Sequence, residues 1–172
     1  MWQRYALAYP ERVQLFPDYT VETFGDSPEL AHALLHEVLH GTKRATSALA
    51  IEFLDEEQSL PRIGSHWIAC DGAGKPRVIL QSSWLKLGTF KDADADFAWD
   101  EGEDDKSLES WQREHAKYWK RTEAAQGRIW DEDMLIVFER FVPVWPESLI
   151  DTEHQDSRCT RTIYAEAGSS KR

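Results

Sequence analysis

The chain has 172 residues, the size of one domain. Hydrophobic residues make up 41% of it, with 8 Trp and 7 Phe, so a packed core is expected. The net charge of −11 repels duplex phosphates and argues against broad binding to nucleic acid, duplex DNA included. A small cationic pocket remains compatible with this charge.

Cellular location is indicated by what the sequence lacks. No apolar run approaches the roughly 20 residues of a membrane helix, and the first residues lack the pattern of a secretory signal. Cys70 and Cys159 form no C-x-x-C motif, so neither a disulfide framework nor a thiolate zinc site is indicated. We expect a cytoplasmic protein without membrane contact, metal or other cofactor.

The first third of the chain predicts an arm, a helix and a strand. Residues 1–24 are rich in aromatic residues and contain two prolines, which indicates an irregular arm with one short helix. "GDSPEL" then predicts a helix that begins near Ser27 and ends near His40, with Gly41 in a left-handed C-cap. "ATSALAIEFL" (45–54) is typical of a strand.

The middle of the chain predicts a hairpin followed by helices. "WIACD" (67–71) and "RVILQSSWLKL" (77–87) read as strands joined by the turn "DGAGKP". A short helix is predicted over 92–99. After the acidic loop "EGEDDK", Ser107 is placed to cap a helix over 108–125.

The last part of the chain predicts one strand and a polar tail. "DMLIVFERFVPVW" (133–145) is the most strand-like segment, and residues 148–172 predict a loosely ordered tail. Strands interrupted by a few helices, without internal repeats, predict an α+β domain around a small barrel or curled sheet. We therefore divide the chain into a domain over 1–147 and the tail.

A zinc-protease signature, H-E-x-x-H, is spelled by His36, Glu37 and His40, and His32 extends the row of imidazoles. At 100° per residue, the leucines of this helix gather on the opposite arc, so the histidines are expected to face solvent. No motif downstream offers a third ligand. We interpret the row as exposed rather than metal-binding.

Lys43 and Thr46 stand three residues apart where the helix passes into the strand. A regular strand would point them to opposite faces, so they can converge only if Lys43 lies in the turn. In that case the lysine can position the Thr46 hydroxyl or take its proton, as in Ser–Lys pairs. The alternative is a solvated loop lysine and a β-forming threonine.

The stretch "FGDSPELAHALLHEVLHGTKRAT" (24–46) resembles the opening of an ASCH domain of the longer bacterial subgroup. "CDGAGKPRVIL" (70–80), "FAWDEGEDDKSLESWQREH" (97–115) and "VFERFVPV" (137–144) agree with it in the same order, so the resemblance spans roughly 1–147. It implies a PUA-like small β-barrel with flanking helices, a fold associated with RNA.

The resemblance also implies site residues. Small bacterial members that share Gly-x-Lys-x-x-Thr and a later glutamate are amidohydrolases of N4-acetylcytidine. Their catalytic triad corresponds here to Lys43, Thr46 and Glu101. Arg44 departs from the usual threonine, which either favours a phosphate-bearing substrate or points the guanidinium outward.

Aromatic residues offer a surface for a base. Trp67 and Trp84 are candidates for stacking on it, although core packing is the more common role of tryptophan in a chain with 8 of them. His115, on the apolar face of its helix, is expected to be a hydrogen-bonded core histidine rather than a catalyst.

Three functions follow for this site. The first is an amidohydrolase that removes the acyl group from an N4-acetylcytidine-like nucleoside. The second is a metal-independent ribonuclease acting on single-stranded RNA, and the third is a non-catalytic module that binds RNA or a nucleotide. The expected partner is therefore a modified nucleoside or single-stranded RNA.

Overall fold

The computed structural model describes residues 1–149, so the tail predicted from residue 148 lies almost entirely outside the described residues. The helices are α1 (Trp2–Ala8), α2 (Pro10–Leu15), α3 (Pro28–His40), α4 (Ala50–Asp55), α5 (Ala95–Glu101) and α6 (Leu108–Ala125). Two 3-10 turns are η1 (Phe90–Asp92) and η2 (Glu147–Leu149). The strands are β1 (Tyr19–Thr23), β2 (Ala45–Leu49), β3 (His66–Cys70), β4 (Pro76–Gly88) and β5 (Ile136–Trp145).

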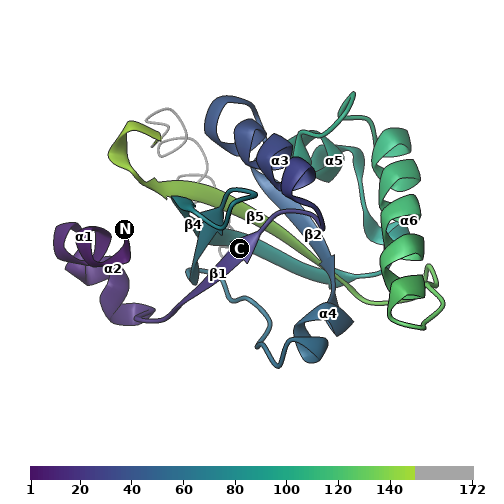
Figure 1. Ribbon diagram of the computed structural model, residues 1–172, viewed down its shortest axis with the longest axis horizontal. Coiled ribbons are helices and arrows are strands. Elements are labelled where there is room, and N and C mark those ends of the chain that lie inside the picture. The colour runs from purple at the N-terminus through teal and green to yellow at the C-terminus, as the bar shows by residue number, and fades with distance from the viewer. Residues whose placement is uncertain (150–172) are drawn as a thin grey trace, which may run out of the picture.

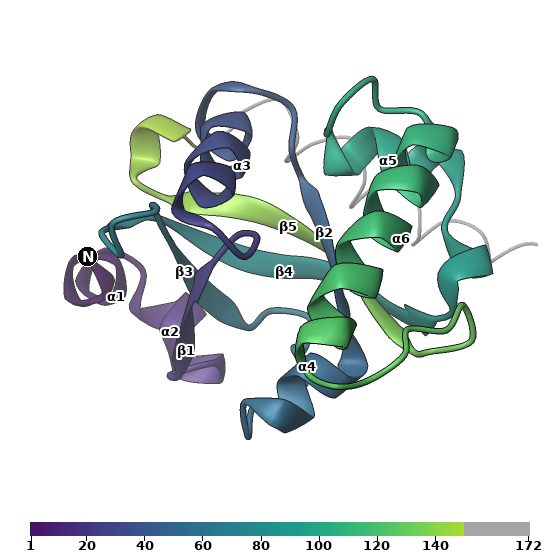
Figure 2. The ribbon, with the colours of Figure 1, turned by 45° about the vertical axis from the view of Figure 1, so that its right-hand side comes forward.

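The five strands form one sheet in the order β1-β3-β4-β5-β2. All neighbouring strands are antiparallel except β1, which pairs with β3 in parallel. The sheet is curled, and the helices lie around it, as Figures 1 and 2 show. The predicted α+β class with flanking helices is confirmed.

Alternation along β5 assigns its side chains to the two faces of the sheet. Ile136, Phe138 and Val144 pack in the clusters that contact α5, α6 and the N-terminal helices. Phe141 points to the opposite face, where it packs with Leu35 of α3. Residues 137 and 139 share the parity of Phe141 and therefore point to the same face of the sheet.

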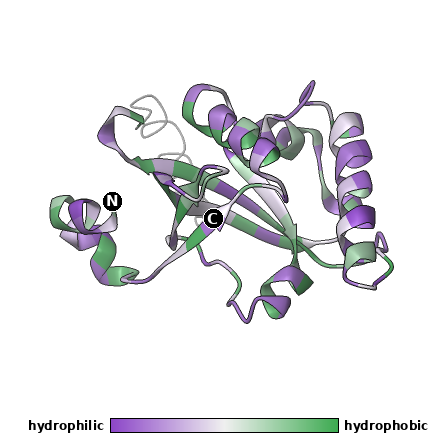
Figure 3. Cartoon of the chain, viewed as in Figure 1, coloured by the Kyte–Doolittle hydropathy of each residue, from purple (hydrophilic) through white to green (hydrophobic). Residues whose placement is uncertain are grey.

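Three groups of buried side chains hold the layers together. One joins β2 and β5 to α5 and α6, a second lies beneath α3, and a third packs α1 and α2 against β3 and β4. In Figure 1, α1 and α2 lie at the end of the molecule away from α6. The exposed side of α6 is largely hydrophilic in Figure 3.

The helix starts predicted near Ser27 and after Ser107 are confirmed. Ser27 accepts a hydrogen bond from the amide of Leu30 at the start of α3, and Ser107 accepts one from Ser110 at the start of α6. The helix and strand predictions for 108–125, 133–145 and the hairpin agree with α6, β5 and the β3–β4 pair within a few residues.

Three local predictions are wrong. The arm contains two short helices and then the strand β1, and the predicted strand over 45–54 turns into α4 after Leu49. Gly41 is extended, at φ −109° and ψ −152°. Space rather than handedness favours glycine there, because an added Cβ would lie 3.0 Å from the main-chain oxygen of Glu37, closer than most such contacts.

Candidate functional site

The edges of the sheet, β1 and β2, face a cleft of about 1470 Å³ that α4 and α6 also line. Its residues come from both faces of β2, because this edge strand divides the cleft. We call Ser47, Glu101, Trp111 and His115 the α6 wall, and Thr46, Trp67, Val137 and Glu139 the sheet wall. All eight residues line the cleft.

Glu101 is the centre of the α6 wall and is 1% exposed. Its Oε1 accepts a hydrogen bond from the Ser47 hydroxyl at 3.1 Å, and its Oε2 accepts one from the Trp111 indole. Burial by itself would raise the pKa of Glu101, but the positive charges of His115 and Lys43 lower it below its ordinary value. Glu101 is therefore an ionised carboxylate held from three sides.

His115 joins Glu101 to the cleft. Its Nε2 lies 3.5 Å from Glu101 Oε2, and its ring stacks on Trp111 at 4.3 Å between centroids. Nδ1 lies 3.0 Å from the Trp111 carbonyl oxygen, which only accepts, so Nδ1 carries a proton. Burial opposes a charge on His115, but the Glu101 carboxylate raises the pKa of the imidazole above its ordinary value. A proton donor therefore lies beside Glu101.

Lys43 is fully buried and lies outside the lining of the cleft, with its Nζ 5.4 Å from the ring centroid of Phe24. Its Nζ donates to Glu103 Oε1 at 2.5 Å and to the main-chain oxygen of Glu101 at 3.4 Å. Gly102 between these glutamates ends α5 in the left-handed region, at φ 72°, and a Cβ there would lie 3.0 Å from Lys43 Cα. Glycine thus lets the two glutamates approach the lysine closely.

Thr46 and Ser47 point to opposite sides of β2. Ser47 lies opposite Phe138 and bonds Glu101, whereas Thr46 lies opposite Glu139 and belongs to the sheet wall. Within residues 1–149, no hydrogen bond joins Lys43 to Thr46. The hydroxyl in direct contact with the predicted glutamate is therefore Ser47.

The sheet wall buries a second glutamate, Glu139, which is 7% exposed. Its Oε1 accepts hydrogen bonds from the Trp67 indole at 3.0 Å and from the Ser82 hydroxyl at 2.6 Å. Burial raises the pKa of Glu139 above its ordinary value, and these two bonds only partly oppose the shift.

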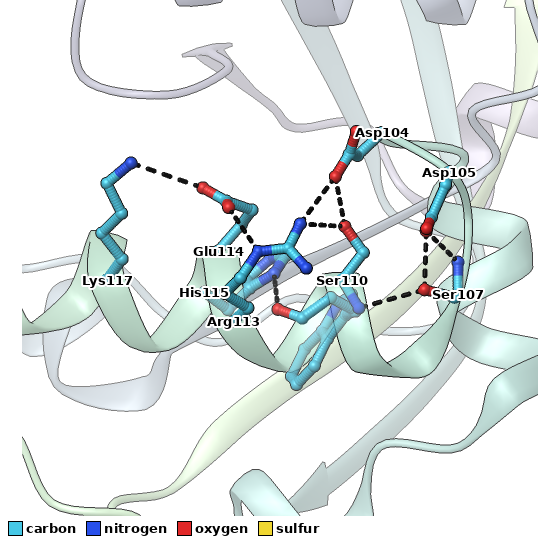
Figure 4. Close-up of polar contacts among 9 residues, drawn as sticks. Asp104, Asp105, Ser107, Ser110, Arg113, Glu114, His115 and Lys117 are labelled. Atoms are coloured by element: carbon cyan, nitrogen blue, oxygen red, sulfur yellow. Dashed lines mark hydrogen bonds and ion pairs between the residues drawn. The ribbon is translucent and has the colours of Figure 1, made fainter.

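The start of α6 carries a network of polar contacts (Figure 4), of which Asp104, Ser107 and Ser110 also line the cleft. Asp104 bonds Ser110 and Arg113, and Asp105 bonds Ser107 at 2.6 Å. Arg113 also donates to Glu114 at 2.9 Å. The acidic loop over 101–106 is thus folded onto the first turns of α6.

The charge of the cleft is strongly acidic. Among residues 1–149, its lining contains eleven Asp or Glu side chains and four Lys or Arg side chains. Burial, with a further contribution from Glu123, raises the pKa of Glu52 on α4 to about 7. An acidic lining opposes a phosphodiester chain and tolerates a neutral ligand.

Of the remaining predicted site residues, the structure places Trp67 in the cleft and Trp84 and Arg44 outside it. Trp67 lines the cleft, but Trp84 lies outside the lining, with the Arg140 guanidinium 4.5 Å from its ring centroid. The Arg44 guanidinium donates to the main-chain oxygens of Val38 and Lys43, which ties the end of α3 to β2. Arg44 is likewise outside the lining.

The imidazole row of α3 is exposed at His32, His36 and His40, as predicted. His36 and His40 lie 4.8 Å apart between ring centroids. Within the described part of the chain, no three His, Cys, Asp or Glu side chains are placed to hold a metal ion. No helix among residues 1–149 is long and apolar enough to cross a bilayer.

The family model of the ASCH domain matches residues 20–144. The chain belongs to the ASCH domain family. Its fold is accordingly PUA-like, a class associated with RNA binding. No curated protein matches the chain significantly.

Two solved structures resemble this ASCH domain. The ASCH domain from Lactobacillus crispatus JV V101 is 26% identical over 83% of this chain and 90% of its own, with a TM-score of 0.74. Protein EF3133 from Enterococcus faecalis V583 is 25% identical over 91% of this chain and 99% of its own, with a TM-score of 0.67.

Sequence reasoning placed Lys43 and Glu101 together but missed Ser47, Glu103 and Glu139. The first two lie next to predicted residues, and only strand parity or the turn at Gly102 distinguishes them. His115 is hydrogen-bonded as expected, yet it also lines the cleft beside Glu101. Its position on the apolar face of the helix did not predict that it would also lie beside Glu101.

Proposed function

We propose that this ASCH domain protein is an amidohydrolase that removes the acyl group from an N4-acetylcytidine-like nucleoside. The observation that carries the proposal is the buried Glu101, ionised between Lys43 and His115 at the wall of a cleft that also presents hydroxyl groups. Perturbed, charge-coupled groups in a cleft are typical of catalytic sites.

The reaction needs a nucleophile, a proton path and stabilisation of the oxyanion. In the proposal, the Thr46 Oγ attacks the acyl carbon. Because Thr46 and Glu101 lie on opposite faces of β2, the proton of Thr46 passes to Glu101 through water around the free edge of this strand. The oxyanion is stabilised by the Lys43 ammonium, and Glu103, which is 31% exposed in its loop, moves aside to admit it. His115 protonates N4 as the C–N bond breaks and cytidine leaves. Water then hydrolyses the acyl-threonine and releases the carboxylic acid.

The acidic lining supports this substrate class over single-stranded RNA. A ribonuclease that grips phosphate needs cations facing its groove, whereas acids outnumber bases in this cleft by eleven to four among the described residues. Arg44, the natural phosphate ligand from the sequence, bonds main-chain oxygens instead. A neutral nucleoside meets neither obstacle.

The test is hydrolysis of N4-acetylcytidine, followed by chromatography of the released cytidine, with a short single-stranded RNA in parallel. Thr46→Val and Ser47→Ala form a matched pair on the two faces of β2. We expect Thr46→Val to lower kcat by about a hundredfold or more and Ser47→Ala by about tenfold or less. Lys75→Ala, in an exposed turn, is the control.

Two results would overturn the proposal. One is a wild-type protein that leaves N4-acetylcytidine intact while it cleaves the RNA. The other is wild-type turnover by both Thr46→Val and Glu101→Gln. A larger loss in Ser47→Ala than in Thr46→Val would instead move the nucleophile to Ser47.

A further inference from the structure

Glu139 has an open hydrogen-bonding position inside the cleft. Both bonds that its carboxylate receives, from Trp67 and Ser82, go to Oε1. Within residues 1–149, Oε2 accepts no hydrogen bond, although the side chain is more than nine-tenths buried and lines the cleft. Oε2 is not one of the buried polar atoms that lack a partner within residues 1–149, so solvent reaches it from the cleft. A ligand with a hydrogen-bond donor can replace that solvent at Oε2, whereas a ligand with an acceptor cannot.

The surroundings define which ligand fits. Glu22, which also lines the cleft, adds negative charge near Glu139 and further raises the pKa of this group. A phosphate or carboxylate would therefore be repelled from Oε2. The position suits a neutral group with an N–H donor.

The position of Glu139 relative to Thr46 further restricts the class of ligand that fits. Thr46 and Glu139 are directly opposed residues of β2 and β5, so their Cβ atoms lie roughly 5 Å apart on the same face. In an N4-acylated cytosine, the same nitrogen carries both the hydrogen and the acyl carbon. A group that binds N4–H must therefore lie next to the group that attacks the acyl carbon.

We infer that Glu139 determines base specificity: its Oε2 accepts a hydrogen bond from N4–H of a cytosine-type base and rejects O4 of uracil. Cytosine presents a donor at this position and uracil presents an acceptor. This inference rests on the proposed function for its orientation of the base. The roles are divided, with the acyl carbon facing Thr46 and the base edge facing Glu139.

The substitution Glu139→Gln inverts the hydrogen bond at one atom. The glutamine carbonyl can still accept from Trp67 and Ser82, but an NH2 donor replaces the accepting Oε2. We measure binding of cytidine and uridine, which require no turnover, by isothermal titration calorimetry. We expect the wild type to prefer cytidine, and Glu139→Gln to lose roughly ten- to a hundredfold in cytidine affinity and to bind uridine at least as well.

Two controls isolate the effect. Glu109→Gln makes the same chemical change on the exposed surface of α6 and leaves both affinities unchanged. Ser82→Ala removes one donor to Oε1 but keeps Oε2 as an acceptor, so the preference for cytidine persists. Circular dichroism of each variant confirms that it is folded.

An unchanged cytidine preference in folded Glu139→Gln overturns the inference, as does a wild type that binds both nucleosides equally or neither. Hydrolysis of N4-acetylcytidine is scored separately. If the protein hydrolyses N4-acetylcytidine but Glu139→Gln does not alter the preference for cytidine over uridine, the proposed function stands and the inference falls. If Glu139→Gln alters the preference but the protein does not hydrolyse N4-acetylcytidine, the inference stands and the proposed function falls.

Discussion

The two walls of the cleft each bury one glutamate, and they do so in opposite ways. Glu101 lies near the positive charges of Lys43 and His115, and its pKa is lowered despite burial. Glu139 accepts two neutral hydrogen bonds, and burial raises its pKa. The difference supports the proposed division of roles, in which the α6 wall holds charge and moves protons and the sheet wall recognises a neutral donor.

The largest expected loss of stability comes from removing the charge of Glu101 in the α6 wall. Glu101→Gln leaves the buried Lys43 with Glu103 as its remaining carboxylate and removes the counter-charge of His115. We expect the free energy of unfolding to fall by about 3 kcal/mol at pH 7, as measured by urea denaturation. Glu109→Gln, the exposed control, should stay within about 0.5 kcal/mol of the wild type.

This destabilisation should depend on pH. Because the folded-state pKa of Glu101 is lowered, its stabilising contribution is present above the unfolded pKa of about 4.3 and is lost as pH falls through the folded value. The gap between the wild type and Glu101→Gln should therefore narrow below pH 4. A gap that stays constant from pH 7 to pH 3 would contradict the charge-pairing account.

In the sheet wall, replacing the buried glutamate by glutamine should change the free energy of unfolding in the opposite direction. The raised pKa of Glu139 means that its ionised form weakens folding as pH rises through the folded value. Glu139→Gln should be as stable as the wild type or about 1 kcal/mol more stable at pH 8, with the gain shrinking toward pH 4. Urea denaturation at both pH values measures it. A clear loss of stability at pH 8 would show that Glu139 is charge-compensated like Glu101.

A smaller effect should come from His115. Its raised folded-state pKa stabilises the protein fully below the unfolded pKa of about 6.5, and this contribution is lost as pH rises through the folded value. The stability difference between the wild type and His115→Gln should therefore be larger at pH 6 than at pH 9. An equal difference at both would mean that the imidazole is neutral beside Glu101.

A small loss of stability should come from Ser82→Ala, which removes one of the two donors to Glu139 Oε1. The remaining Trp67 bond keeps the carboxylate in place, so the loss should be roughly 1 kcal/mol. Thermal unfolding measures it. A loss as large as that of Glu101→Gln would mean that the sheet wall is as strongly coupled as the α6 wall.

Local patterns predicted much of the fold. The caps at Ser27 and Ser107 and the apolar stripes set α3 and α6, and alternation set most of β3 to β5. The strand β1 was missed because "YTVET" becomes a strand through parallel pairing with β3, in which paired residues are 47 positions apart, as Tyr19 is from His66. The helix α4 was missed because the apolar residues of Ala50–Asp55 fit a strand as well as a helix. The strand ends where the Ala50 amide donates a hydrogen bond to the Leu135 carbonyl oxygen, and the sequence does not show this long-range contact.

The site was predicted less completely, for a physical reason. Lys43, Thr46 and Glu101 follow from a motif, but their contacts depend on strand register and on the tight turn at Gly102. Register turned Ser47 rather than Thr46 toward Glu101, and it placed Glu139 opposite Thr46. Trp84 was chosen by residue type and Arg44 by its position after Lys43 in the motif, and neither lines the cleft.

The most direct test of the division between the two walls is to measure kcat and KM for N4-acetylcytidine in Glu101→Gln and Glu139→Gln. The account predicts that Glu101→Gln lowers kcat by about a hundredfold with little change in KM, while Glu139→Gln raises KM by about tenfold or more with kcat within a few-fold of the wild type. Wild-type kinetics in both variants, or the two effects exchanged between them, would contradict it.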